Sequence, residues 1–411
     1  MIGIAPPPPI AEIDLVLACA RVELDDSSQR RMLESLEAPL DWARVLDFAG
    51  RHGLNPLLHR HLSSRPAARI PKPVMAALWG GYELGLRRNR KAARELARIV
   101  ADFAAHDIPA LPYKGPVLAE SVYGDLGLRE FGDLDILLPR ADIARATALL
   151  EAAGYRADFD LAPAAADAMF RSWRGTEVLL RKPPHLVELH WRTDPDFPVE
   201  IDEPGWWREL RCAPLEGVMM AAFDPTELLL VLCIHGGKHR WAALGWLVDI
   251  AEMLRRETAI EWAVIAARAR TLGVERRIYV GLALAGDLLD APLPWQVRER
   301  CGQSDVAPLA QRIRADILSA RGAPAGAFRT LRGELELSDR VSRRVLHVAR
   351  TIFVPSMAEF SRWPLPRALH FLYVPLRLVR LAGKHLFTRR SPRNQAAATP
   401  RTPPPQPHST G

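Results

Sequence analysis

The chain has 411 residues, of which 48% are hydrophobic and 25% charged, and its formal net charge is +7. This length and composition allow a sizeable core, so wholesale disorder is excluded and two or three domains are expected. The four cysteines have neither metal nor disulfide spacing, and no apolar run reaches the length of a membrane span. These features predict a protein of the reducing cytoplasm.

The positive charge is concentrated near the C-terminus. Residues 340–390 contain eleven Lys or Arg and a single acid, Glu359, which gives the segment a net charge of +10. Arg393 and Arg401 add two more, so by difference from +7 residues 1–339 carry about −5. The body of the chain is therefore mildly acidic, and long nucleic acid is not expected as a partner.

A helical region is expected over residues 11–107, after a disordered proline-rich lead at 1–10. Apolar spacing predicts helices over Ile13–Val22, Ser27–Ser35, Asp41–His52, Leu54–Ser63 and Pro73–Leu86, followed by a long helix ending near Ala105. The last helix carries six basic side chains, Arg87, Arg88, Arg90, Lys91, Arg94 and Arg98. We interpret them as a solvated face, with contact to phosphate as the alternative.

The next stretch has the pattern of a phosphate-binding turn. A strand is expected over Ile108–Tyr113, and Pro116 suits the first position of a helix that continues through Tyr123. Gly115, between strand and helix, would let phosphate oxygens approach free backbone N–H groups. Lys114 can add a charge to the same anion, and Arg129 a forked donor.

Two carboxylates then stand at the polar start of an apolar strand. In an extended strand Asp133 and Asp135 share one face, while Leu134 and Ile136 point into a core. The two acids repel each other, and their burial is costly without a cation or a donor. A divalent metal such as Mg²⁺ prefers carboxylate oxygens and would resolve this conflict.

A third acid follows on a later strand. After a helix over Arg140–Ala153, two strands are expected at Glu177–Leu180 and His185–Trp191, joined by residues 181–184. On the second strand Glu188 shares its face with His190, and it is a candidate third metal-binding or acceptor-activating carboxylate. The alternative is a surface strand with a chance charged face.

The ordered motifs of this chain resemble those of a known family. They are Tyr113-Lys114-Gly115, Gly127-Leu128-Arg129, Gly132-Asp133-Leu134-Asp135, Glu188-Leu189-His190-Trp191, His235-Gly236-Gly237-Lys238-His239 and Trp246-Leu247-Val248-Asp249. The set is similar to the uncharacterised bacterial nucleotidyltransferases of the DNA polymerase β superfamily, over roughly residues 40–385. The resemblance implies an α+β fold, with a small mixed-sheet nucleotidyltransferase core at 108–205 flanked by N- and C-terminal helical regions.

The resemblance also implies a chemistry. Asp133, Asp135 and Glu188 would be catalytic and would hold two Mg²⁺ ions, with Mn²⁺ as an alternative. They would move an NMP group from a nucleoside triphosphate such as ATP to an acceptor, which is left open between small molecule, peptide, protein and RNA. Lys114, Gly115 and Arg129 would bind the nucleotide.

One residue departs from the superfamily pattern. Pro116 follows the signature glycine, where Gly or Ser is usual, and proline removes one backbone donor. The alternative function is therefore a non-catalytic nucleotide-binding or partner-binding relative, accessory to a biosynthetic pathway.

The helical domain expected over 206–320 contains a second polar motif. Asp224 is a candidate N-cap, and the helix that follows carries His235, Lys238 and His239. These three are candidate substrate contacts; capping or buried polar contacts and zinc binding are the alternatives. Asp249 lies among apolar neighbours, which predicts a buried partner, such as one of these histidines.

The remaining segments are read from composition and periodicity. Residues 206–222 are interpreted as a transition with Trp206 and Trp207 in a core or interface, and 320–335 as a linker. Further helices are expected over Trp246–Leu254, Trp262–Arg270, Val274–Asp290, Gln296–Cys301, Val341–Phe353 and Pro364–Phe387.

The sequence of the basic C-terminal section, 321–390, allows three interpretations. It can be a helical cap on the domain, a peripheral contact with a membrane surface, or a surface for nucleic acid or a partner. Residues 391–411 are expected to form a disordered tail.

Overall fold

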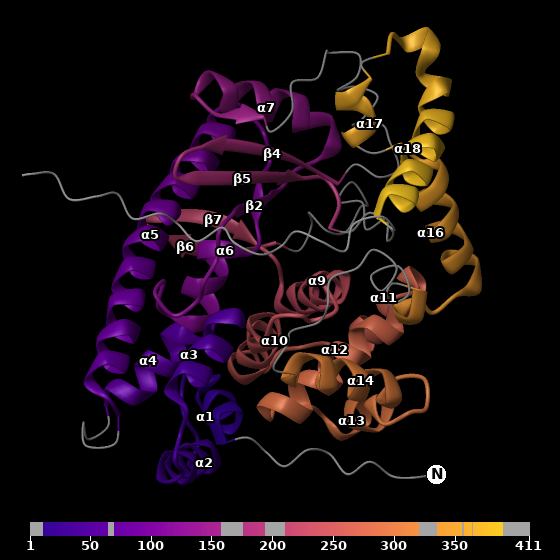
Figure 1. Cartoon of the computed structure of the whole chain (residues 1–411). Coiled ribbons are helices and arrows are strands. Elements are labelled where there is room, and N and C mark those ends of the chain that lie inside the picture. The colour runs from indigo at the N-terminus through magenta and orange to yellow at the C-terminus, as the bar shows by residue number, and fades with distance from the viewer. Residues whose placement is uncertain are drawn as a thin grey trace, which may run out of the picture.

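The computed structural model describes residues 11–64, 70–157, 176–193, 210–319, 335–355, 357–363 and 365–388. The expected lead, the expected tail, most of the expected linker and Trp206 and Trp207 lie outside these residues. The predicted α+β fold is confirmed, because a small mixed sheet is surrounded by helices (Figure 1).

The N-terminal region is helical, as predicted. It contains α1 (Ala11–Cys19), α2 (Asp26–Glu37), α3 (Trp42–Arg51), α4 (Asn55–Ser63) and α5 (Lys72–Ala105). The expectation of two helices between Pro73 and Ala105 is wrong, because α5 is one continuous helix of 34 residues. Gly80, Gly81 and Gly85 do not break it, since a glycine inside a helix costs only about 1 kcal/mol and packing along the rest of the helix outweighs that cost.

The five-stranded sheet has the order β1-β2-β5-β4-β3. Its strands are β1 (Leu111–Pro112), β2 (Leu134–Leu137), β3 (Arg156–Ala157), β4 (Glu177–Lys182) and β5 (His185–His190). β2 is antiparallel to β1 and parallel to β5, whereas β4 is antiparallel to both of its neighbours. α7 (Ile143–Ala152) follows β2 after a short 3₁₀ turn at Arg140–Asp142. The predicted strands are thus present, although the first is shorter than expected.

Residues 206–222 correct the sequence interpretation. The described part is a β-hairpin, β6 (Arg211–Leu215) and β7 (Val218–Ala222), which the interpretation as a transition did not predict. Its two-residue turn has Glu216 and Gly217 at positive φ, 49° and 79°, as in the turns that match the twist of paired strands. The hairpin packs against β1, beside the five-stranded sheet.

The second helical region contains α9 (Pro225–Lys238), α10 (Leu244–Arg256), α11 (Trp262–Leu272), α12 (Glu275–Leu289), α13 (Trp295–Cys301) and α14 (Ala307–Leu318). Asp224 caps α9 as predicted, because its carboxylate accepts a hydrogen bond from the Thr226 backbone N–H. α14 was not anticipated from the sequence.

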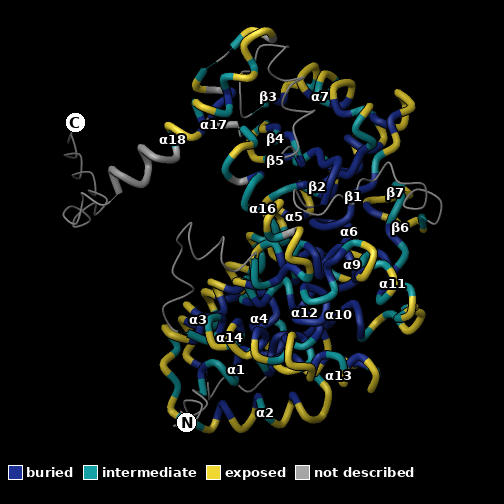
Figure 2. The backbone as a smooth tube through the Cα atoms, turned by 90° about the vertical axis from the view of Figure 1, so that its right-hand side faces the viewer, coloured by how far each residue is buried: buried dark blue, intermediate teal, exposed yellow. Residues whose placement is uncertain are grey.

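The buried side chains form two hydrophobic cores. One core joins the N-terminal helices to α9–α14, and the other lies between the sheet, α7 and the second half of α5 (Figure 2). α5 belongs to both, since Val74 and Leu78 lie in the first core and Leu96 and Phe103 in the second. At 1.5 Å per residue the helix spans about 50 Å, enough to connect the two cores.

The C-terminal section forms α16 (Val341–Phe353), α17 (Met357–Arg362), a 3₁₀ turn (Arg367–Leu372) and α18 (Tyr373–Thr388). Phe360 and Tyr373 are buried in the core of the sheet domain. Part of this section therefore packs on the core of the sheet. Among the described helices, none is both long and apolar enough to cross a membrane.

Candidate functional site

The turn before α6 (Gly115–Leu118) brings the chain close to the start of β2. Gly115 has φ +53°, and a Cβ atom placed there would lie 3.2 Å from the Asp133 carbonyl oxygen. Both the backbone conformation and this close approach favour glycine. Pro116 is the second helical residue and not the first, and a short π-helix (Ala119–Tyr123) continues the turn of helix. The predicted strand, glycine and helix are thus found in this order.

Asp135 and Glu188 are direct neighbours in the sheet. β2 and β5 run in parallel, and their register pairs Asp135 with Glu188. Asp135 is buried, and Glu188 is partly exposed. Asp133 precedes β2 and is half-buried, and the charges of Asp135, Lys114 and Glu188 act on its pKa. The parallel pairing thereby joins acids that are 53 residues apart in the chain.

Basic side chains lie among these acids. Lys114 Nζ is 2.8 Å from Asp135 Oδ1, and His190 Nε2 is 3.0 Å from the same oxygen. His190 Nε2 also lies 3.3 Å from Glu188 Oε2, and its Nδ1 lies 3.3 Å from Glu177 Oε2. The sequence did not single out Glu177, nor His190 as a site residue. For His190 the available signal was its place on the same strand face as Glu188.

The pKa values reflect this mutual arrangement. Burial would raise the pKa of Asp135, but the charge of Lys114 and the hydrogen bond from His190 hold that pKa well below its usual range. Burial would lower the pKa of His190, but the hydrogen bond to Asp135 and the close carboxylates of Glu177 and Glu188 raise it to about 10. Burial and the charge of Asp135 raise the pKa of Asp133 to about 6. At neutral pH, His190 is therefore an imidazolium that bridges carboxylates.

The same cluster contains a set of metal donors. Within the described ranges, Asp135, Glu188 and His190 have ligand atoms within 4.8 Å of one another. Two carboxylates and one imidazole suit a divalent cation, and Lys114 and His190 already supply positive charge at the carboxylates. The residues therefore fit a divalent metal that would take over this role. Asp133 lies outside this set of three.

Arg129 lies in a second buried charge cluster. Its guanidinium donates through Nε to Asp249 Oδ1 (2.8 Å) and through Nη2 to Asp249 Oδ2 (2.9 Å). Tyr123 donates its hydroxyl to the same carboxylate at 2.6 Å. The expectation that a histidine partners Asp249 is therefore wrong. In this arrangement the guanidinium predicted to bind phosphate is held by Asp249.

Comparison with protein families gives a match over residues 38–290 to the model described as "Uncharacterised nucleotidyltransferase". This range covers more than half of the chain and contains the sheet, the acidic cluster and α9–α10. The chain belongs to this family. No match was found among curated proteins or among solved structures.

The α9 motif lies against the acidic cluster. His235 Nδ1 is 3.4 Å from Lys114 Nζ, and Lys238 Nζ is 3.9 Å from Glu177 Oε2. Burial, followed by the charge of Lys114, lowers the pKa of His235 well below its usual value, so its ring is neutral. His239 stacks on Trp246 of α10 with 4.9 Å between ring centroids. The three residues predicted as substrate contacts thus share one end of α9, with two of them beside the acidic cluster.

The paired glycines of the motif serve packing. A Cβ atom on Gly236 would lie 2.5 Å from Trp241 Nε1, and one on Gly237 would lie 2.2 Å from Arg277 Cγ. Both distances are shorter than any ordinary contact, so larger residues would displace α12 or the turn after α9. Close approach explains two glycines that weaken the helix itself.

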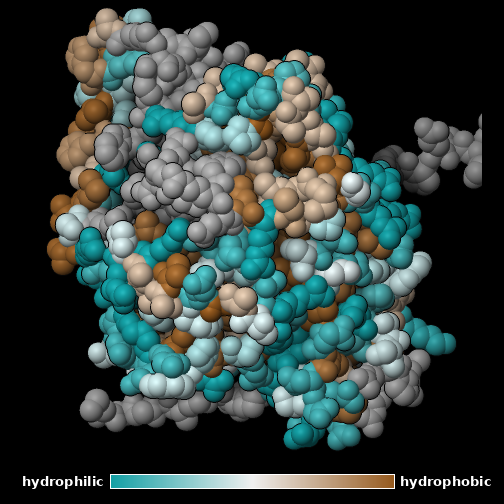
Figure 3. Space-filling view, turned by 180° about the vertical axis from the view of Figure 1, so that it is seen from behind, coloured by the Kyte–Doolittle hydropathy of each residue, from teal (hydrophilic) through white to brown (hydrophobic). Residues whose placement is uncertain are grey.

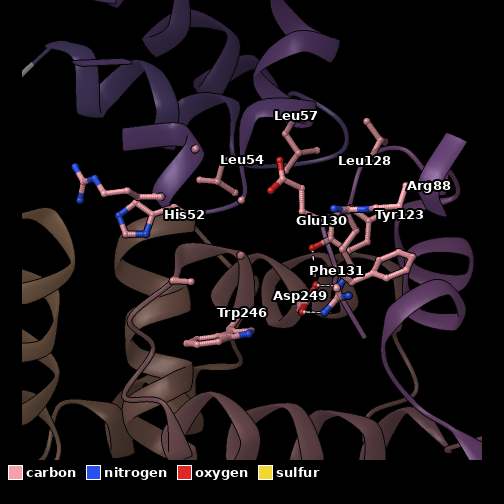
Figure 4. Close-up of a pocket in the computed structure, with 17 residues that line it drawn as sticks. His52, Leu54, Leu57, Arg88, Tyr123, Leu128, Glu130, Phe131, Trp246 and Asp249 are labelled. Atoms are coloured by element: carbon pink, nitrogen blue, oxygen red, sulfur yellow. Dashed lines mark hydrogen bonds and ion pairs between the residues drawn. The ribbon is translucent and has the colours of Figure 1, made fainter. Parts of the chain in front are cut away.

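A cleft of about 350 Å³ opens beside the site. Leu54 and Leu57 of the N-terminal helices lie opposite Trp246, while Glu130 and Phe131 belong to the loop that leads to Asp133 (Figure 4). The Arg129–Asp249 pair also lines the cleft, together with other residues including His52, Arg88 and Gly132. Arg88, Phe131 and Gly132 also line a smaller cavity that reaches Asp133. The cleft and the acidic cluster are therefore connected through one loop.

Proposed function

We propose that this protein transfers an NMP group from a nucleoside triphosphate to an acceptor, using Mg²⁺ or Mn²⁺. The observation that carries the proposal is the pairing of Asp135 with Glu188 on neighbouring parallel strands, beside the Gly115 turn. Four carboxylates, Asp133, Asp135, Glu177 and Glu188, gather there around Lys114, His190 and Lys238. A cluster with more carboxylates than basic side chains is suited to bind a divalent metal and, with it, a polyphosphate.

Each side chain has a distinct part in the proposal. Asp135 and Glu188 would hold metal, with Asp133 completing the site from the loop, and bound metal would neutralise charge on the entering and leaving oxygens. Lys114 would turn from Asp135 toward the phosphates, guided by the neutral His235 at 3.4 Å. Glu188, the more exposed acid, would accept the proton of the attacking hydroxyl.

His190 can adjust the charge of this site by holding or releasing a proton. Its imidazolium offsets the acids in the resting protein, and a divalent cation would make that charge redundant. His190 would then release a proton to solvent, which would leave a neutral ring nitrogen available as a metal ligand. Alternatively, its ring would turn toward Glu177. An imidazole in the donor set favours Mn²⁺ over Mg²⁺ relative to a set of carboxylates alone.

The cleft beside the loop is suited to the organic part of a substrate. Its volume of about 350 Å³ is in the range of small-molecule sites. Phe131 and Trp246 offer aromatic surface, and Arg88 and Glu130 offer opposite charges at the same cleft. We therefore favour a small acceptor over a protein or RNA.

The experiment is transfer from labelled nucleotides. Purified protein is incubated with each α-labelled NTP, Mg²⁺ or Mn²⁺, and a metabolite extract, and nucleotidylated products are identified by mass. The Asp133→Asn/Asp135→Asn variant is the control. Product with the parent protein and none with the variant supports the proposal.

The competing function is binding without catalysis, and Pro116 favours it. Its missing N–H removes one donor from the start of α6. Metal-dependent NTP binding measured by calorimetry, without any transfer product across the extract fractions, would favour this alternative and overturn the proposed reaction.

A further inference from the structure

The outer surface of the C-terminal section carries an unusual concentration of exposed apolar side chains. Eight of the thirteen large hydrophobic residues that are exposed in the described part of the chain lie between 341 and 379. They are Val341, Val345, Leu346, Phe353, Leu369, Phe371, Leu378 and Val379. Figure 3 shows hydrophobic residues along the edge formed by α16 and α18, at the left of that view. We call these eight residues the apolar edge.

The apolar edge is distinct from the face that covers the sheet domain. Phe360 and Tyr373 point into the core, and the Tyr373 hydroxyl donates to the Trp363 carbonyl at 2.8 Å. Glu359 is fully buried and is paired with Arg377 and Arg380. This section therefore already has a packed inner face, and the exposed residues belong to a second face.

Three arginines near the apolar edge have uncharged partners among the residues that the structure describes. Arg340 donates to the Arg270 carbonyl, and Arg344 donates to the Ser338 carbonyl. Arg362 lies over the Trp363 ring. These described partners are uncharged, so they do not neutralise the guanidinium charges. The one acid within 340–390, Glu359, already forms buried ion pairs with Arg377 and Arg380.

We propose that the apolar edge and these arginines form a binding surface for an anionic lipid membrane. Apolar side chains inserted among headgroups and cations beside them are the two components of interfacial binding. Charge complementarity selects this occupant, since a second copy of the chain would bring a second set of like charges to the same face. Nucleic acid would use the cations but would leave the valines and phenylalanines exposed.

The two helices are placed to act together. α16 and α18 lie side by side, and Val341 and Val345 are one helical turn apart on α16. Each carries a largely exposed side chain, 70% and 63% respectively. The proposed surface thus consists of two adjoining helices that would lie in the plane of the membrane.

The test is co-sedimentation of the full-length protein with vesicles. One set is phosphatidylcholine alone, and the other contains equal parts of phosphatidylcholine and phosphatidylglycerol. We expect pelleting with the anionic vesicles only, decreasing as salt is raised. Val341→Glu/Val345→Glu should lower the bound fraction by about tenfold.

A matched variant controls for the general effect of removing exposed apolar surface. Trp79→Glu/Leu84→Glu changes two residues of α5 that are 58% and 72% exposed, far from α16. It should bind anionic vesicles as the parent does, and both variants should keep the parent melting temperature.

Three results would overturn the proposal. One is equal pelleting with neutral and anionic vesicles, and another is equal loss of binding in the two variants. The third is a dimer of the parent that Val341→Glu/Val345→Glu converts to monomer, which would assign the surface to a second copy. Transfer activity is not used as a readout, so the outcome is independent of the proposed reaction.

Discussion

Two buried charge clusters lie on either side of the loop that joins Tyr123 to Asp133. They differ in the balance between acidic and basic side chains. In one cluster, Arg129 donates two parallel hydrogen bonds to Asp249, and the Tyr123 hydroxyl donates a third to the same carboxylate. In the other, four carboxylates share three basic side chains, and each contact is made through single atoms.

We interpret the difference as one between a structural ion pair and the proposed binding site. A balanced, bidentate pair leaves no capacity for a ligand, and breaking it exposes an uncompensated buried charge. An acid-rich cluster with exchangeable cations retains a capacity for added positive charge. Under the proposed function, the loop contributes to stability through Arg129 and to the reaction through Asp133.

The largest expected effect is on the proposed reaction. Glu188→Gln keeps the size of the side chain but removes its charge and basicity, so kcat should fall by about 10⁴-fold, or ~5 kcal/mol of activation free energy. The melting temperature should change little, because Glu188 is partly exposed. Glu151→Gln on the exposed face of α7 is the matched control. Near-parent turnover of Glu188→Gln would exclude this carboxylate from the reaction.

The second expected effect is on stability. Arg129→Met or Asp249→Leu alone should lower the free energy of unfolding by about 3–5 kcal/mol, because each leaves a buried charge without its partner. The double variant should recover much of this loss. Urea unfolding of the four proteins gives the coupling energy. Additive losses would show that the two clusters do not differ in the way described.

The third effect is on pH dependence in the metal-free protein. The pKa of His190 is raised from 6.5 to about 10 by hydrogen bonds to carboxylates that outweigh burial. A raised pKa means that the folded state binds the proton more tightly than the unfolded chain. Its stabilisation is fully present below about pH 6.5 and is lost as pH rises to 10, by an amount on the order of 5 kcal/mol.

His190→Gln tests this assignment. The variant should lack the decline in stability between pH 6.5 and 10 that the parent shows, measured by urea unfolding at each pH. An identical decline in both proteins would assign it to another group.

The smallest effect concerns the end of α9. Lys238 and Glu177 are 3.9 Å apart and both partly exposed, so Lys238→Met should change stability by less than about 1 kcal/mol. If Lys238 contacts the phosphates, KM for the nucleotide should rise severalfold while kcat is retained. A fall in kcat at constant KM would place Lys238 in the transition state instead.

Much of the local structure could be predicted because its signals are local. The strand of Asp135, the Gly115 turn, the N-cap at Asp224 and the strand of Glu188 all follow from residue type and short periodicity. The β6–β7 hairpin and the continuity of α5 could not be predicted in this way. Each depends on packing against distant elements that outweighs weak or contrary local preferences.

The sequence by itself determined the types of element, the acids that bear the proposed chemistry and the charge asymmetry between the body and residues 340–390. Only the tertiary structure decided which charges meet. Arg129 and Asp249 are 120 residues apart, and Lys114 and His190 reach Asp135 from different elements. The physical reason is that side-chain periodicity repeats within a few residues, whereas ion pairs between elements arise only when those elements pack together.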